Sequence, residues 1–350
     1  MRHFIFLIIA LFSTLTWSKP SPELVARIDK LMAPYTGAKI PGASVAIFKE
    51  DEVFFAKAYG LRELKTQAAT TLQTNYRIAS LTKAFTATAI LQLVENGLLS
   101  LDTNLKELFP SFADYGSKIT VRHLLTHTSG VKDYESFSFS GQITDKEILA
   151  LLGKQKSTDF NPGSRFRYSN SGYVLLSCIV EAVSQSSFQD FLSKNIFKPL
   201  HMENTMAFIS GVNSVSNRAY GYSPSSSGFV LTDQSKTSAT LGDGGVYSSV
   251  EDLFQWYRMW VLKDSVLKLE TLDLMTTPAQ LNSGKKTGYG FGWFLGEHQG
   301  SQKLSHTGST IGQKHALSFF PEKKLGIIVL VNRENAAPWE IVEEITQLVF

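Results

Sequence analysis

The segment Tyr76-Arg77-Ile78-Ala79-Ser80-Leu81-Thr82-Lys83 joins an extended stretch to an apolar helix that is predicted to continue to Val94. Ser-x-x-Lys alone is a weak pattern, because it occurs again at Ser129, Ser265 and Ser283. Only the Ser80 copy stands at a predicted helix start, where residues three apart share a face and first-turn N–H groups are free. A serine nucleophile needs a nearby base and an anion-stabilising pocket, and this position can supply both. A helix cap beside a solvated lysine remains the alternative at this point.

Tyr168-Ser169-Asn170 is a second candidate group and the only Tyr-x-Asn in the chain. It follows Pro162-Gly163 and precedes a helix predicted at 172–183. A buried phenol near a lysine can exchange its proton at modest cost, and an asparagine amide can hold a substrate carbonyl. An ordinary loop aromatic followed by a helix cap would give the same three residues. The motif therefore indicates a catalytic role only in combination with other motifs.

Segments near the two chain ends carry the strand patterns, and the middle of the chain is mostly helical. Strands are predicted at residues 43–48, 53–59, 290–295, 315–320 and 326–331. Helices are predicted at residues 22–32, 81–94, 121–126, 144–153, 172–183, 187–197, 248–262 and 339–349, with a long loop at 210–245. This order predicts an α+β fold, in which an antiparallel sheet flanked by helices is built from both chain ends. The sheet region covers about 19–79 and 235–350, and the inserted helical region about 80–234.

The composition excludes several classes of protein. Lys plus Arg number 34 and Asp plus Glu 31, which leaves a net charge of +3 without a clustered basic face, so we expect no nucleic-acid partner. A hydrophobic content of 43% with 19% charged residues predicts a folded globular chain. The single cysteine, Cys178, excludes intrachain disulfides and cysteine-based zinc sites, and its helical position predicts a buried, inert thiol. With no His-Glu-x-x-His pattern either, we expect no metal and no cofactor.

Residues 1–18 have the pattern of a secretory signal peptide. Met1-Arg2-His3 is a short positive start, and nine apolar residues, Phe4 to Phe12, precede a polar stretch that ends at Ser18. Nine residues are too few for a bilayer span, which needs roughly 20, so we expect cleavage after Ser18 and no stable span in the mature chain. A lone thiol is harmless in an oxidising compartment. We therefore expect secretion across the inner membrane into a Gram-negative periplasm.

Three boxes in order, Ser80-Leu81-Thr82-Lys83, Tyr168-Ser169-Asn170 and His306-Thr307-Gly308, resemble those of the serine β-lactamase and penicillin-binding-protein family. The resemblance is greatest to the class C-like branch, which includes D-Ala-D-Ala carboxypeptidases, D-amino-acid peptidases and esterases. It extends over roughly Pro41 to Asn332, with supporting segments at residues 124–130, 244–248 and 289–293. It implies the β-lactamase/transpeptidase-like fold and catalysis through an acyl-enzyme.

The resemblance also implies a role for each box residue. Ser80 would be the nucleophile, and Lys83 and Tyr168 would share the task of general base. The backbone N–H groups of Ser80 and Ser309 would form the oxyanion hole. Substrate would be bound and oriented by the remaining residues, Asn170, His306, Thr307 and Gly308.

The function implied is that of an exported serine hydrolase acting on amides or esters, as a D-Ala-type peptidase or an esterase. Its partner would be a small molecule or a peptide derived from peptidoglycan. One alternative is a true class C-like β-lactamase. Another is a non-catalytic protein that binds penicillin or peptidoglycan, although such a binder would not need Lys83. The absence of Gly-x-Ser-x-Gly from the chain disfavours an unrelated serine-hydrolase fold.

The third box has a competing copy, since Lys286-Thr287-Gly288 matches the family's Lys-Thr-Gly letter for letter. This copy immediately precedes residues 289–293, which in relatives belong to the strand before the box. We therefore assign the box to His306 and keep Lys286 as the alternative. Relatives that bind β-lactams well usually carry lysine there, whereas histidine, with a reference pKa of ~6.5, is largely neutral at pH 7. A neutral imidazole keeps one hydrogen bond but no charge, which predicts weak β-lactamase activity.

The other histidines carry no catalytic signal in the sequence. His127 is expected to have a structural role in its turn. Surface or packing positions are expected for His123, His201, His298 and His315.

Overall fold

The computed structural model describes residues 19–262 and 266–350, so the predicted signal peptide at 1–18 lies outside the described residues. The helices are α1 Pro22–Met32, α2 Thr82–Glu95, α3 Leu105–Leu108, α4 Val121–Leu125, α5 Asp145–Gly153, α6 Asn170–Ser184, α7 Phe188–Leu192, α8 Val250–Leu262, α9 Leu269–Met275 and α10 Pro338–Val349. The strands are β1 Ala43–Lys49, β2 Glu52–Tyr59, β3 Leu61–Glu63, β4 Ala68–Ala69, β5 Tyr76–Arg77, β6 Met206–Ala207, β7 Tyr222–Ser225, β8 Gly228–Leu231, β9 Val246–Ser248, β10 Phe294–His298, β11 Ser301–Thr310, β12 Gln313–Phe320 and β13 Leu325–Val331. Within 19–262 and 266–350, no helix has both the length and the apolar content that crossing a membrane requires.

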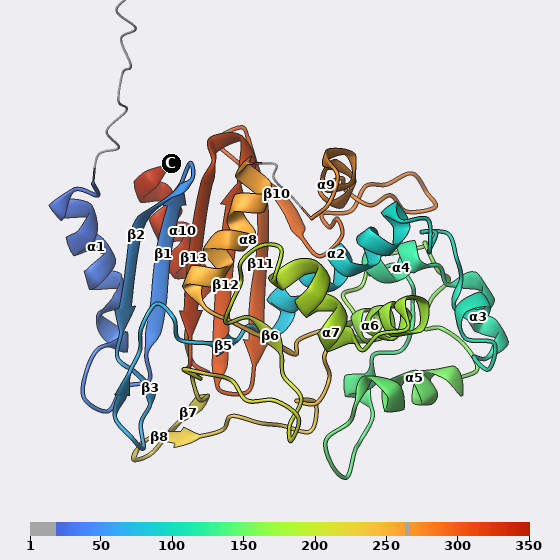
Figure 1. Ribbon diagram of the computed structural model, residues 1–350, viewed down its shortest axis with the longest axis horizontal. Helices are drawn as coiled ribbons and strands as arrows, with labels where there is room; N and C mark the ends of the chain where they lie inside the picture. Colours follow the sequence, from blue (N-terminus) through green and yellow to red (C-terminus); the bar gives the residue numbers. More distant parts are fainter. Residues whose placement is uncertain (1–18, 263–265) are drawn as a thin grey trace, which may run out of the picture.

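The main sheet joins the two ends of the chain (Figure 1). Its six strands follow the order β10-β11-β12-β13-β1-β2, and every neighbouring pair is antiparallel. The junction is the β1–β13 pair, in which Val45 lies opposite Val329. The predicted α+β fold, with an antiparallel sheet built from both chain ends, is therefore confirmed.

Helices cover both faces of this sheet (Figure 1). On one face, Val45 and Ile47 of β1 belong to a core that also contains residues of α1 and α10. On the other, Phe48 of β1 lies 5.3 Å, ring centre to ring centre, from Tyr257 of α8. Because successive strand residues point to opposite faces, β1 needs apolar residues on both, which explains its almost continuous apolar sequence.

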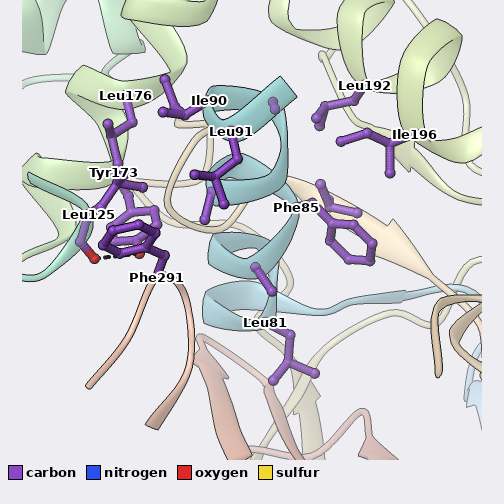
Figure 2. Close-up of a cluster of buried hydrophobic side chains, with 14 of the residues drawn as sticks. Leu81, Phe85, Ile90, Leu91, Leu125, Tyr173, Leu176, Leu192, Ile196 and Phe291 are labelled. Atoms are coloured by element: carbon purple, nitrogen blue, oxygen red, sulfur yellow. Dashed lines mark hydrogen bonds between the residues drawn. The ribbon is translucent and has the colours of Figure 1, made fainter. Parts of the chain in front are cut away.

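Helix α2 runs through the helical region and is surrounded by apolar side chains (Figure 2). Its Phe85 packs on Trp256 of α8 with ring centres 4.3 Å apart, and neighbouring Tyr173 of α6 donates a hydrogen bond to the Leu125 carbonyl at 2.9 Å. Burial of one large apolar side chain contributes about 1.5–3 kcal/mol, so many such contacts fix the helix in place. Lys83, the second residue of α2, is held in this rigid environment.

The structure differs from the sequence prediction at several segments. The loop predicted at 210–245 contains the β7–β8 hairpin, and the predicted helix 187–197 changes to a π-helical turn after α7. The strand predicted at 290–295 begins only at Phe294, because Gly292 has a φ of +82° and lies against Ala84 too closely for a side chain. The residue pattern did not predict strand β11, since its polar sequence lacks the alternation of a half-buried strand, although the family resemblance implies a strand that carries the box.

Candidate active site

Ser80 and Lys83 lie together where α2 begins. Ser80 is half-buried in the 3-10 turn Ala79–Leu81, and Lys83 follows one turn later with no exposed surface. The Lys83 Nζ lies 3.0 Å from the Ser80 Oγ. It also donates to the Asn170 Oδ1 at 2.8 Å and to the Asp243 backbone carbonyl at 2.9 Å. The lysine is thus fixed by two further acceptors in a position where it can exchange a proton with the serine hydroxyl.

The turn before Ser80 is strained and held in place. Ala79 has a φ of +49°, a left-handed conformation that costs a residue with a side chain about 1–3 kcal/mol. The Ile78 N–H donates to the Val246 carbonyl at 3.0 Å, and His315 Nε2 lies 2.8 Å from the Arg77 carbonyl. His315, expected to be a surface or packing residue, is therefore a buried support of this turn.

Tyr168 lies beside Lys83 on the loop that leads into α6. Its ring centre is 4.9 Å from the Lys83 Nζ and 4.3 Å from the ring centre of His127. Within the part of the chain that the structure describes, its hydroxyl is buried and has no hydrogen-bond partner. His127 accepts a hydrogen bond from the Ser169 N–H at 3.1 Å, which agrees with the structural role expected for it. The phenol is thus held by ring contacts while its oxygen stays unpaired.

Strand β11 brings the third box to the same place. A Cβ added at Gly308 would lie 2.3 Å from the Ile78 carbonyl oxygen, so this strand passes directly against the chain that leads to Ser80. His306 is buried, whereas Thr307 and Ser309 are exposed, as strand alternation requires. The Ser309 Oγ accepts a hydrogen bond from the Lys314 ammonium of β12. The eight candidate site residues therefore lie on three segments: the turn and helix start around Ser80 and Lys83, the loop and helix start at 168–170, and β11.

His306 is neutral and has no N–H left for a ligand. Burial, followed by the positive charge of Lys83, lowers the pKa of this imidazole to about 3. Its Nδ1 lies 2.7 Å from the Thr307 carbonyl, which can only accept, so the proton belongs on Nδ1. The Nε2 then accepts from the Tyr289 hydroxyl at 3.3 Å. The one hydrogen bond that the neutral imidazole can donate is thus made within the protein, to the Thr307 carbonyl.

The competing copy does not belong to β11. Lys286 is exposed, and a backbone bridge pairs it with Gln280. Cys178 is buried, as expected, and burial raises its pKa. Across residues 19–262 and 266–350, no group of three or more His, Cys, Asp or Glu could hold a metal ion.

Two acidic residues near the site, Asp243 and Glu135, were not among the candidates that the sequence offered. Asp243 contributes the backbone carbonyl that holds Lys83, and its carboxylate accepts from the Tyr134 hydroxyl at 2.8 Å. Glu135 lies at the edge of the site. Although Glu135 is exposed, its carboxyl is partly removed from water, which raises its pKa, as do the charges of Asp133 and Asp243, while the Asn170 amide and Lys83 oppose the shift. The only sequence signal for Asp243 was its position directly before the supporting segment 244–248.

The six-stranded sheet, the inserted helices and the Ser80–Lys83 pair together define the serine β-lactamase/transpeptidase class of fold. A family model described as Beta-lactamase matches residues 26–345. The chain therefore belongs to the beta-lactamase family, whose members are serine hydrolases.

Relatives and solved structures agree with this membership. The chain is 29% identical to penicillin-binding protein 4* of Bacillus subtilis, over 83% of its own length and 67% of the relative's. Against protein flp of Staphylococcus aureus the identity is also 29%, over 89% and 63% of the two lengths. The chain thus spans about two thirds of these curated relatives.

Two solved structures have closely similar folds. The octameric penicillin-binding protein homologue from Pyrococcus abyssi is 32% identical with a TM-score of 0.81, covering 93% of this chain and 76% of that one. A D-stereospecific amidohydrolase from Streptomyces is 25% identical with a TM-score of 0.76, covering 92% and 98%.

Proposed function

We propose that this protein is a serine hydrolase that forms an acyl-enzyme on Ser80 with amide or ester substrates. The observation that carries the proposal is the 3.0 Å contact between the Lys83 Nζ and the Ser80 Oγ at a helix start. When Lys83 is neutral, this contact reverses, so that the serine hydroxyl donates its proton and the amine accepts it. The free N–H groups of the first turn lie at the same place.

The proposed reaction has two halves. In the first, the Ser80 oxygen attacks the substrate carbonyl carbon, its proton passes to Lys83, and the carbonyl oxygen becomes an anion. The N–H groups of Ser80 and Ser309 bind that anion. The bond to the leaving nitrogen or oxygen then breaks as the unpaired Tyr168 hydroxyl gives it a proton. In the second half, water attacks the ester carbonyl on Ser80 and gives its proton to the Tyr168 oxygen. The bond to the Ser80 oxygen breaks, the acid is released, and Lys83 returns the proton to Ser80. Asn170 and Thr307 orient the substrate, which binds against Gly308.

The charges around the site favour substrates that are neutral or carry an ammonium group. They disfavour substrates that carry a carboxylate beside the scissile bond. The neutral His306 offers neither charge nor a free donor. Glu135 adds a carboxyl group close enough to Asn170 and Lys83 for both to act on its pKa. A D-amino acid amide or a short acyl ester, as acted on by a D-Ala-type peptidase or an esterase, fits this balance better than a penicillin. The similarity to a D-stereospecific amidohydrolase supports the same choice.

Replacing His306 by lysine should raise kcat/KM for nitrocefin about 10-fold and leave p-nitrophenyl butyrate turnover unchanged. The new ammonium restores a charge-assisted hydrogen bond to a carboxylate, worth about 1–2 kcal/mol, which a neutral ester cannot use. Steady-state kinetics on both substrates measure the effect, with the exposed His201→Lys as the control for an added charge. Because His306 has a pKa of about 3, its charge should not change between pH 5.5 and 8.5. A wild-type protein that hydrolyses nitrocefin near the diffusional limit would instead favour the β-lactamase alternative.

Intact-protein mass spectrometry after exposure to benzylpenicillin, p-nitrophenyl butyrate and a D-amino acid amide tests the function itself. The proposal expects an acyl adduct on the peptide that contains Ser80, absent from Ser80→Ala, together with turnover of the ester or amide. A stable penicillin adduct without any turnover would support the non-catalytic binding alternative. An adduct that persists in Ser80→Ala contradicts the assignment.

The same proposal includes export to a Gram-negative periplasm, where peptidoglycan-derived peptides are available. Cleavage after Ser18 would leave Lys19 as the first residue of the mature protein. N-terminal sequencing of the exported protein tests this, and retention of residues 1–18 in the membrane fraction would contradict it.

A further inference from the structure

The segment Leu241–Val246 passes behind Lys83 and is bonded to α2 at three successive places. The Asp243 carbonyl accepts from the Lys83 ammonium at 2.9 Å, and the Gly242 carbonyl accepts from the Thr86 hydroxyl at 2.7 Å. The Val246 N–H donates to the Thr82 hydroxyl at 3.2 Å. The position of this backbone therefore decides where the Lys83 ammonium is held.

Asp145, the first residue of α5, holds the same segment from its other side. Its Oδ1 accepts from the Leu241 N–H at 2.9 Å, and its Oδ2 accepts from the Gly242 N–H at 3.1 Å. The Ser177 hydroxyl of α6 donates to Oδ2 as well. The two peptide N–H groups bound by this one carboxylate immediately precede the Asp243 peptide that holds Lys83.

The packing leaves the segment little room to adjust. A Cβ added at Gly242 would lie 2.3 Å from the Tyr173 carbonyl oxygen and 2.6 Å from the Ser177 Oγ, so this backbone lies directly on α6. On the far side, Tyr134 holds the Asp243 carboxylate at 2.8 Å. A change in the hydrogen bonds between Asp145 and this segment is therefore transmitted to the Asp243 carbonyl, because closely packed interiors transmit displacements.

We infer that Asp145 is a positioning residue for the reaction of Ser80, acting through Leu241–Asp243 on the carbonyl that orients Lys83. The inference rests on the proposed function, because it assigns Asp145 to the same proton transfer. Asp145 itself does not contact substrate in this role. Loss of its hydrogen bonds to the Leu241 and Gly242 N–H groups should therefore lower kcat and leave KM unchanged.

The charge state of Asp145 provides a readout that a purely structural residue lacks. Removal from water raises its pKa to about 7, and Asp243 adds to the shift, while Ser177 and the two peptide N–H groups oppose it. Of the groups around it, Lys146 and Glu181 line the same hollow of about 400 Å³, and the Cys178 thiol faces it from α6. Below pH 7 the carboxyl gains a proton, becomes a donor at one oxygen and binds the peptide N–H groups less strongly.

The test compares wild type with Asp145→Asn, which fixes the neutral form at every pH. At pH 8.5 we expect kcat for p-nitrophenyl butyrate to fall about 10-fold, a moderate effect for a misplaced catalytic group. As the pH falls to 5.5, wild type becomes neutral at this position too, so the ratio of the two kcat values should approach 1. This ratio cancels every pH effect that the two proteins share. Glu147→Gln, which removes another first-turn carboxylate from α5, is the matched control and should leave kcat unchanged.

The possible outcomes separate this role from the proposed function. An unchanged kcat in Asp145→Asn, or a ratio that is the same at every pH, overturns the role of Asp145. A wild-type protein without a Ser80 adduct overturns the proposed function and this role with it. If Asp145→Asn does not fold, Ser177→Ala provides the second test. The Ser177 hydroxyl lowers the pKa of Asp145, so in this variant the midpoint of the kcat–pH profile should lie at higher pH than in wild type. A midpoint that does not move overturns the role.

Discussion

Replacing Lys83 by alanine is expected to lower kcat/KM for p-nitrophenyl butyrate by about 10²-fold or more, the usual contribution of a positioned general base. The Lys83 Nζ is within 3.0 Å of the Ser80 Oγ, and two neutral oxygen atoms fix its position. Among the described residues, the Lys83 amine is the one group that a hydrogen bond joins to the Ser80 hydroxyl. Steady-state kinetics give the overall effect, and the rate of adduct formation by mass spectrometry isolates acylation.

The exposed Lys286 supplies the matched control, because it belongs to the literal Lys-Thr-Gly copy. Lys286→Ala should retain wild-type kcat/KM. The unfolding temperature of Lys83→Ala shows whether the variant is still folded, because the truncation leaves a cavity and three acceptors without their donor. Wild-type activity in Lys83→Ala, or lost activity in Lys286→Ala, would contradict the assignment.

The fold could be predicted from the sequence because its signals are local. The apolar runs of β1 and β13 and the amphipathic ends of the chain were sufficient to predict a sheet made from both termini. The polar strand β11 could not be recognised in this way, although it carries His306 and Gly308. Its conformation depends on pairing with β10 and β12, and such pairing leaves no pattern in the strand's own residues.

The residues that hold the candidate site in place could likewise be predicted only where their partners are close in sequence. The capping box of Thr144 and Glu147 was readable, because both partners lie within one helical turn, and the structure confirms it. The bond from Asp145 to Leu241 spans 96 residues of sequence. The charge state of His306 likewise depends on burial and on Lys83, which no local pattern specifies. Chemistry-bearing residues could thus be named from motifs, whereas the groups that orient them required the fold.

Replacing Gly308 by alanine should reduce kcat/KM by about 10²-fold, the scale seen when an oxyanion donor is lost or misplaced. The added Cβ would lie 2.3 Å from the Ile78 carbonyl oxygen and 3.1 Å from the His315 Cδ2. Both neighbours are buried, so either β11 or the turn before Ser80 must shift. Such a shift separates the Ser309 N–H from the position that the substrate oxyanion would occupy. Kinetics with p-nitrophenyl butyrate measure the loss.

The stability change should be smaller than the loss of activity, because overpacking by one methyl group costs typically 1–3 kcal/mol. Gly296→Ala on the adjacent strand β10 is the matched control, since a Cβ there meets nothing within 4 Å and should leave both activity and unfolding temperature close to wild type. Mass spectrometry at saturating ester then separates slow acylation of a folded protein from unfolding. A folded Gly308→Ala protein with wild-type acylation would show that β11 does not carry the oxyanion hole, and the role of Ser309 would have to be reassigned.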